Sequence, residues 1–129
     1  MNAWAAQELT LLRACWPTLI HAEGTNWCKI PEFAIPPGWN TAATDVAFQL
    51  PDGLPGQEPY AFLVADGLTL ASGAGITNYT FPAAVPPWDG TWGQFSWNLN
   101  PWAPGAAPGQ GTSMVDFVRS FTGRLLELT

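Results

Sequence analysis

The sequence is short of positive charge. Only four of its 129 residues are lysine or arginine, against ten aspartates and glutamates, so the formal net charge is −6. A protein that binds nucleic acid needs a basic surface to displace counterions from the phosphates. The composition therefore argues against this class of protein, and we expect no nucleic-acid partner.

Long apolar runs are missing as well. A membrane-spanning helix needs about 20 consecutive apolar residues, and no stretch of this chain reaches that length. The first residues, MNAWAAQELTLLRACW, lack the basic start that precedes the apolar core of a signal peptide. We expect a cytoplasmic protein with no membrane partner, in which Cys15 and Cys28 are reduced thiols rather than a disulfide.

Metal ligands and cofactor motifs are equally scarce. One histidine, His21, and two cysteines far apart in the sequence do not form a tetrahedral metal set. The glycine motif that cradles phosphates and the serine nucleophile elbow of hydrolases are both absent. The sequence thus predicts no metal and no cofactor.

What the chain does contain is an ordinary share of apolar residues, 47%, in a length that suits one domain over residues 1–129. Residues 2–17 predict a helix, because Leu9 and Leu12 fall at helical spacing with Trp4 and Trp16. Asn2 can cap the start of this helix, and Pro17 ends it.

Four short extended segments follow: 18–23, 27–33, 45–51 and 60–65. Gly24 and Asn26 separate the first two and indicate a hairpin. Short links force neighbouring strands to pair antiparallel, so the sequence predicts a four-stranded antiparallel meander. From Asp66 to Gln94 no period is evident, and we expect an ordered loop region with one short strand.

A second helix is predicted over residues 112–128. Ser113 and Asp116 have the spacing of a capping box. The expected apolar stripe consists of Met114, Phe117, Val118, Phe121, Leu125 and Leu128. A helix, a meander, a loop that holds the site and a closing helix define an α+β fold.

The segment QFSWNLNPWAPG, residues 94–105, is the candidate site. It contains tryptophans, prolines, asparagines and one serine, and no charged side chain. If the segment is extended, Ser96 and Asn98 project to the same side, because side chains two residues apart share a face. The plain alternative is that both satisfy backbone groups in a proline-bounded turn.

Several short motifs resemble the ubiquitin-conjugating enzymes. Leu54–Pro59 stands where this family has a proline-rich turn, and Trp102-Ala103-Pro104 where it has a Trp-x-Pro step. The chain is more similar still to a bacterial branch, prokaryotic family E. That branch has the PPGWN turn, present at Pro36–Asn40, and a Phe-Ser-x-His-Leu motif before Trp-x-Pro-Gly, present at Phe95–Leu99 and Trp102–Gly105.

The resemblance implies a carrier of a ubiquitin-like protein. Its partners would be a ubiquitin-like protein and its activating enzyme, and its setting a bacterial operon that defends against phage. The family's cysteine is missing before the Trp-x-Pro step, and Ser96 is the residue nearest to its place. Asn98 replaces the histidine of the bacterial motif, and either Asn98 or Asn78 from the preceding loop can act as an oxyanion donor.

Three alternatives follow from these departures. Ser96 accepts the ubiquitin-like C-terminus as an oxyester, with Asp89 or His21 as base. A displaced cysteine, Cys28 or Cys15, is the nucleophile. Otherwise the chain is an inactive binding module of the same fold. In each case Trp97, Trp102 and Pro104 serve as structural support or as part of a partner surface.

Overall fold

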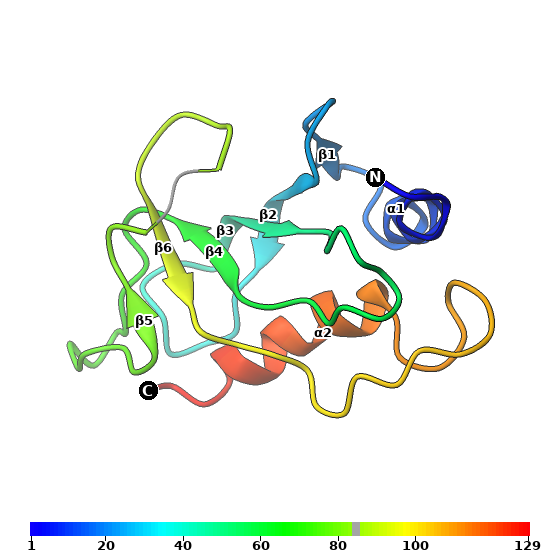
Figure 1. Ribbon diagram of the computed structural model, residues 1–129. Coiled ribbons are helices and arrows are strands. Elements are labelled where there is room, and N and C mark those ends of the chain that lie inside the picture. Colours follow the sequence, from blue (N-terminus) through cyan, green and yellow to red (C-terminus); the bar gives the residue numbers. More distant parts are fainter. Residues whose placement is uncertain (84–85) are drawn as a thin grey trace.

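The computed structural model describes residues 1–83 and 86–129, and that part of the chain forms two helices and six strands. The helices are α1 (Ala3–Cys15) and α2 (Met114–Leu125). The strands are β1 (Ile20–His21), β2 (Trp27–Ala34), β3 (Ala43–Gln49), β4 (Phe62–Ala65), β5 (Tyr79–Thr80) and β6 (Trp92–Phe95). This order confirms the predicted α+β class, with one helix on each side of the strands in the sequence (Figure 1).

All neighbouring strands of the sheet are antiparallel, in the order β1-β2-β3-β4-β6-β5. The predicted meander corresponds to β1 through β4. The sheet extends beyond this meander by two strands, where one short strand was expected, because β6 pairs with β4 and β5 pairs with β6. Strand β5 lies within the region from Asp66 to Gln94 that was expected to be mostly loop, and β6 begins in that region and ends one residue after it. Residues 84 and 85 of this region lie outside the described part of the chain.

Helix α1 forms as the sequence predicts. The side-chain oxygen of Asn2 accepts a hydrogen bond from the backbone N–H of Ala5 at 2.8 Å, which caps the first turn. The buried residues of α1 recur at the spacing of one helical face: Ala5, Glu8, Leu9 and Leu12. A carboxylate therefore lies within an otherwise apolar stripe.

Helix α2 carries the predicted capping box and most of the predicted stripe. The Asp116 carboxylate accepts from the backbone N–H of Ser113 at 2.9 Å. The prediction that Leu128 belongs to the buried stripe is wrong. The helix ends at Leu125, and Leu128 has a left-handed φ of 55° with 44% of its surface exposed. The buried stripe therefore ends three residues before Leu128.

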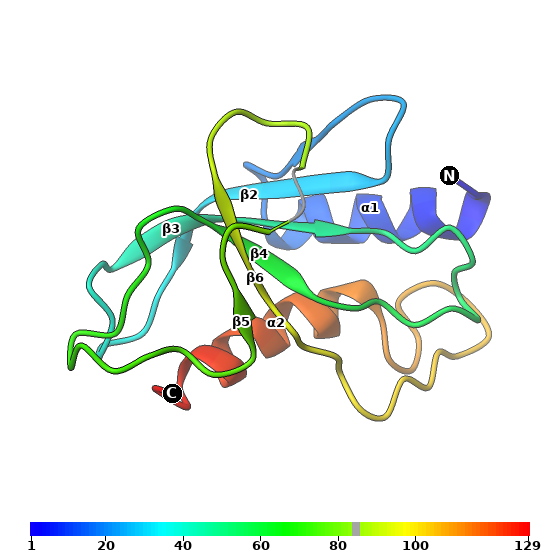
Figure 2. The same cartoon turned by 60° about the vertical axis from the view of Figure 1, so that its left-hand side comes forward.

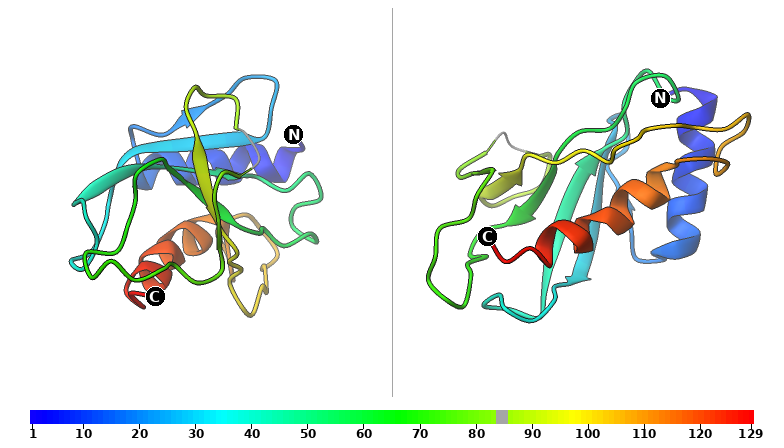
Figure 3. Two further views of the ribbon diagram at one scale, coloured as in Figure 1. Left: turned by 90° about the vertical axis from the view of Figure 1, so that its left-hand side faces the viewer. Right: turned by 90° about the horizontal axis from the view of Figure 1, so that it is seen from below.

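The main core lies between the sheet and the helices. Helix α2 runs across one face of the sheet, and α1 packs beside it (Figures 1 and 3). At the centre of this core, the ring of Phe62 stacks on Phe121 with 4.1 Å between centroids, and on Phe95 with 4.8 Å. Burial of these rings ties β4 and β6 to α2.

The opposite face of the sheet carries a smaller cluster. Ala47, Leu63 and Trp92 are buried there, and Trp27 and Trp88 are partly buried against them. The Nζ atom of Lys29 lies 5.2 Å from the centroid of the Trp88 ring, which is a cation–π contact. Residues 86–91, which lead into β6, extend on the side of the sheet away from α2 (Figures 1 and 2).

Candidate functional site

Ser96 is the first residue after β6, and its side chain is exposed. The backbone N–H of Ser96 donates to the carbonyl of Asn78 at 2.8 Å, which continues the pairing of β5 and β6 by one residue. The hydroxyl is thus carried on a backbone position that the sheet holds fixed.

Burial alternates along the segment that follows β6. Phe95 is buried, Ser96 and Asn98 are exposed, and Trp97 and Leu99 are partly buried. This alternation is what an extended backbone produces, because successive side chains point to opposite sides. The hydroxyl of Ser96 and the amide of Asn98 therefore both face solvent on the outer side of one segment.

Trp97 anchors this segment from the inner side. Its indole Nε1–H donates to the hydroxyl of Ser120 on α2 at 2.8 Å. The carbonyl of Trp97 accepts from the backbone N–H of Ala61 at 2.7 Å. These two bonds fix the residue between Ser96 and Asn98 to the last helix and to the start of β4.

Trp102 and Pro104 hold the next stretch. The Nε1–H of Trp102 donates to the carbonyl of Pro55 at 2.9 Å, in the proline-rich loop between β3 and β4. Pro104 forms an isolated antiparallel bridge with Gly111. These contacts tie Trp102 to the loop between β3 and β4 and Pro104 to the residues that precede α2.

The structure brings no base to Ser96 among residues 1–83 and 86–129. Its hydroxyl has no hydrogen bond to a histidine or a carboxylate there. His21 lies on β1, at the other edge of the sheet, and its Nε2 is 2.7 Å from the carbonyl of Thr25. Asp89 is exposed in the loop before β6 and makes no hydrogen bond within the described residues.

The two cysteines differ sharply. Cys28 is fully buried in β2, and its burial raises the pKa of the thiol to about 12. At neutral pH this thiol is protonated and out of reach, so the folded protein does not offer it as the alternative nucleophile. Cys15 is exposed at the end of α1, where Arg119 Nη2 lies 3.7 Å from its sulfur.

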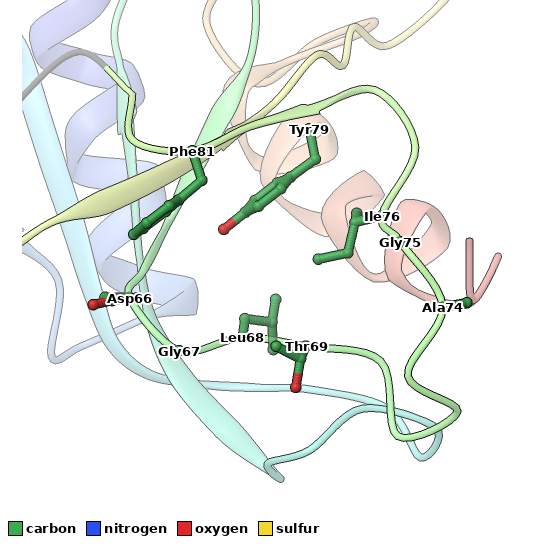
Figure 4. Close-up of a pocket in the computed structure, with 9 residues that line it drawn as sticks. All are labelled: Asp66, Gly67, Leu68, Thr69, Ala74, Gly75, Ile76, Tyr79 and Phe81. Carbon is green, nitrogen blue, oxygen red and sulfur yellow. The ribbon is translucent and has the colours of Figure 1, made fainter.

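The structure also shows a cavity that sequence reasoning missed. It has a volume of about 380 Å³ and lies between the loop after β4 and the residues that lead into and out of β5 (Figure 4). Its lining consists of Asp66, Gly67, Leu68, Thr69, Ala74, Gly75, Ile76, Tyr79 and Phe81. The sequence signal was weak because this region shows neither a helical nor a strand period.

Two further features are absent from the described part of the chain. Residues 1–83 and 86–129 contain no group of three or more histidine, cysteine or acidic side chains that could hold a metal ion. No helix in that same part combines the length and the apolar character needed to cross a membrane.

Comparisons of the chain with protein-family models, with curated proteins and with solved structures return no match.

Proposed function

We propose that this protein is a bacterial ubiquitin-conjugating-like transferase that carries the C-terminus of a ubiquitin-like protein as an oxyester on Ser96. The observation that carries this proposal is the exposed Ser96 hydroxyl, which the sheet fixes and which two anchored tryptophans follow in the chain. The order of helix, antiparallel meander, site segment and closing helix is consistent with a conjugating-enzyme fold.

The transfer takes place in two balanced steps. The Ser96 oxygen attacks the thioester carbonyl of the ubiquitin-like protein on its activating enzyme, the thiolate leaves, and the serine proton passes to the medium or to a group of the partner. An acceptor amine then attacks the ester carbonyl, forms an amide and releases the Ser96 hydroxyl. In both steps the amide N–H of Asn98 donates to the oxyanion of the tetrahedral intermediate.

The test is an adduct assay with the full chain, its activating enzyme, ATP and the ubiquitin-like protein. We expect an adduct that resists thiols, is cleaved by hydroxylamine, and is lost in Ser96→Ala. Ser72→Ala is the matched control, because Ser72 is an exposed loop serine away from the site segment. A thiol-sensitive adduct lost in Cys15→Ala would contradict the proposal and assign the transfer to cysteine.

A second candidate function is an inactive module that binds the ubiquitin-like protein or its activating enzyme. The observation in its favour is that the described residues supply no base to Ser96, whose hydroxyl is a weak nucleophile without one. This candidate predicts saturable partner binding with no adduct. The binding would be unchanged in Ser96→Ala, since no covalent step takes place.

A further inference from the structure

We propose that Arg124 is a positioning residue for Ser96, because its side chain contacts both of the backbone segments that hold this serine. The inference rests on the proposed function, in which the Ser96 hydroxyl reacts. Arg124 lies in the last turn of α2. In two views the C-terminal end of this helix is the end nearer to β5 (Figures 1 and 2).

Arg124 is the one buried cation in the described part of the chain. Only 2% of its surface is exposed, whereas Arg13 and Arg119 are exposed and Lys29 is half-buried. Its Nη1 atom is buried and has no hydrogen-bond partner within residues 1–83 and 86–129. A buried charge with an unsatisfied donor is unfavourable in a core, and an apolar side chain of similar size would avoid that cost. Core stability therefore does not account for an arginine at this position, which points to a role in function.

The first contact reaches the segment that lies opposite Ser96. The Nη2 atom of Arg124 donates to the carbonyl of Thr77 at 2.7 Å. Thr77 precedes Asn78, whose carbonyl accepts from the backbone N–H of Ser96 at 2.8 Å. The same Nη2 atom donates to the backbone oxygen of Thr129 at 2.9 Å, so the guanidinium group is itself held in place. The hydrogen bond that fixes Ser96 is thus one residue away from the arginine.

The second contact reaches the strand that carries Ser96. The guanidinium carbon of Arg124 lies 5.0 Å from the centroid of the Phe95 ring, which is a cation–π contact. Phe95 is the last residue of β6 and directly precedes Ser96. If the segment that contains Thr77 moved relative to β6, at least one of the two contacts would be lost. Arg124 therefore fixes the position of the Ser96 backbone, on which the approach of a reacting carbonyl depends.

The first test is amide hydrogen exchange of the full chain, followed by NMR. In Arg124→Met we expect the Ser96 amide to exchange about tenfold faster, which is the effect of weakening one hydrogen bond. The amide of Val46, which is buried in the middle of the sheet, should keep its exchange rate. Arg119→Met is the matched control, because Arg119 is an exposed arginine of the same helix. It should leave the Ser96 amide unchanged.

The second test measures single-turnover transfer from the charged activating enzyme to Ser96. In Arg124→Met the limiting rate should fall by about tenfold or more, since a displacement of about 1 Å can cost about 100-fold. The half-saturating concentration of activating enzyme should not change, because Arg124 is buried and cannot contact it. Arg124→Lys keeps the cation and one donor, so it should restore part of the rate. Rates are divided by the folded fraction, which urea unfolding gives for each variant.

The outcomes separate this inference from the proposed function. Unchanged exchange of the Ser96 amide in both Arg124 variants, an equal effect of Arg119→Met, or a normal limiting rate in a folded Arg124 variant would overturn the positioning role. Failure of Arg124→Lys to fold would also overturn it, because the residue would then be needed for the whole fold. The exchange test needs no partner protein. If the wild type formed no adduct, the proposed function would fail, while faster exchange in the Arg124 variants would still show that Arg124 holds the Ser96 backbone.

Discussion

The contact between Gly93 and Tyr79 gives the sharpest prediction for the fold around the cavity. In Gly93→Ala the new methyl carbon would lie 1.8 Å from the hydroxyl oxygen of Tyr79, 2.2 Å from Cζ and 2.7 Å from Cε1. Carbon atoms in contact need about 3.5–4.0 Å, so the tyrosine ring must move away from β6. Its packing against Phe95 is then lost.

The loss of stability in Gly93→Ala has two sources, the lost packing of Tyr79 on Phe95 and the crowding by the added carbon. An aromatic pair contributes about 0.5–1.5 kcal/mol beyond its buried area, and an added carbon in a packed site costs about 1–3 kcal/mol. These costs overlap because they describe one displacement, so we expect Gly93→Ala to lower the free energy of unfolding by about 1–3 kcal/mol. Urea unfolding monitored by tryptophan fluorescence measures this, with an unchanged denaturant slope.

A double-mutant cycle shows whether Tyr79 is the cause. In a Tyr79→Ala background the space opposite Gly93 is free, and Gly93→Ala should then be neutral or stabilising by up to about 1 kcal/mol, since alanine restricts the unfolded chain. The coupling free energy between the two positions should be about 1–3 kcal/mol. The reasoning is refuted if Gly93→Ala costs the same in both backgrounds, or nothing in the wild type.

Three further predictions concern the core and the site segment. Burial raises the pKa of Glu8, so the wild-type protein loses stability as pH rises through the folded-state pKa of this group. Glu8→Gln has no such group, so its free energy of unfolding in urea, relative to wild type, should rise from pH 4 to pH 8. A difference that does not change with pH would contradict this prediction. Cys15 should react with a thiol reagent in the folded protein, while Cys28 should react only when the protein unfolds. Rapid reaction of both thiols in the folded protein would show that Cys28 is accessible and would contradict this prediction. Trp102→Phe removes the hydrogen bond to the Pro55 carbonyl and should cost about 1–2 kcal/mol in urea unfolding; an unchanged midpoint would contradict the anchoring role.

The helices and the meander were predictable because their signals are local. Asn2 caps α1 and Asp116 caps α2 through atoms a few residues away in the sequence, so the pattern alone contains the information. The exposure of Ser96 and Asn98 likewise follows from the two-residue period of an extended chain.

The remaining features depend on contacts distant in sequence. Strand β6 is four residues long and includes Gly93, so its period is too short to read, and its pairing with β4 spans about thirty residues. The bonds of Asn40 to Gly67 and of Arg124 to Thr77 are equally remote. Leu128 matched the helical period, yet the chain leaves the helix at Leu125, which the period could not indicate.

The most direct test of the central claim is to locate the covalent bond by mass spectrometry of the adduct formed with the activating enzyme, ATP and the ubiquitin-like protein. We expect protease digestion to leave the C-terminal remnant of the ubiquitin-like protein on the peptide that contains Ser96, through a bond that hydroxylamine cleaves. A remnant on Cys15 or on Lys29, or no adduct while the activating enzyme itself is charged, would contradict it.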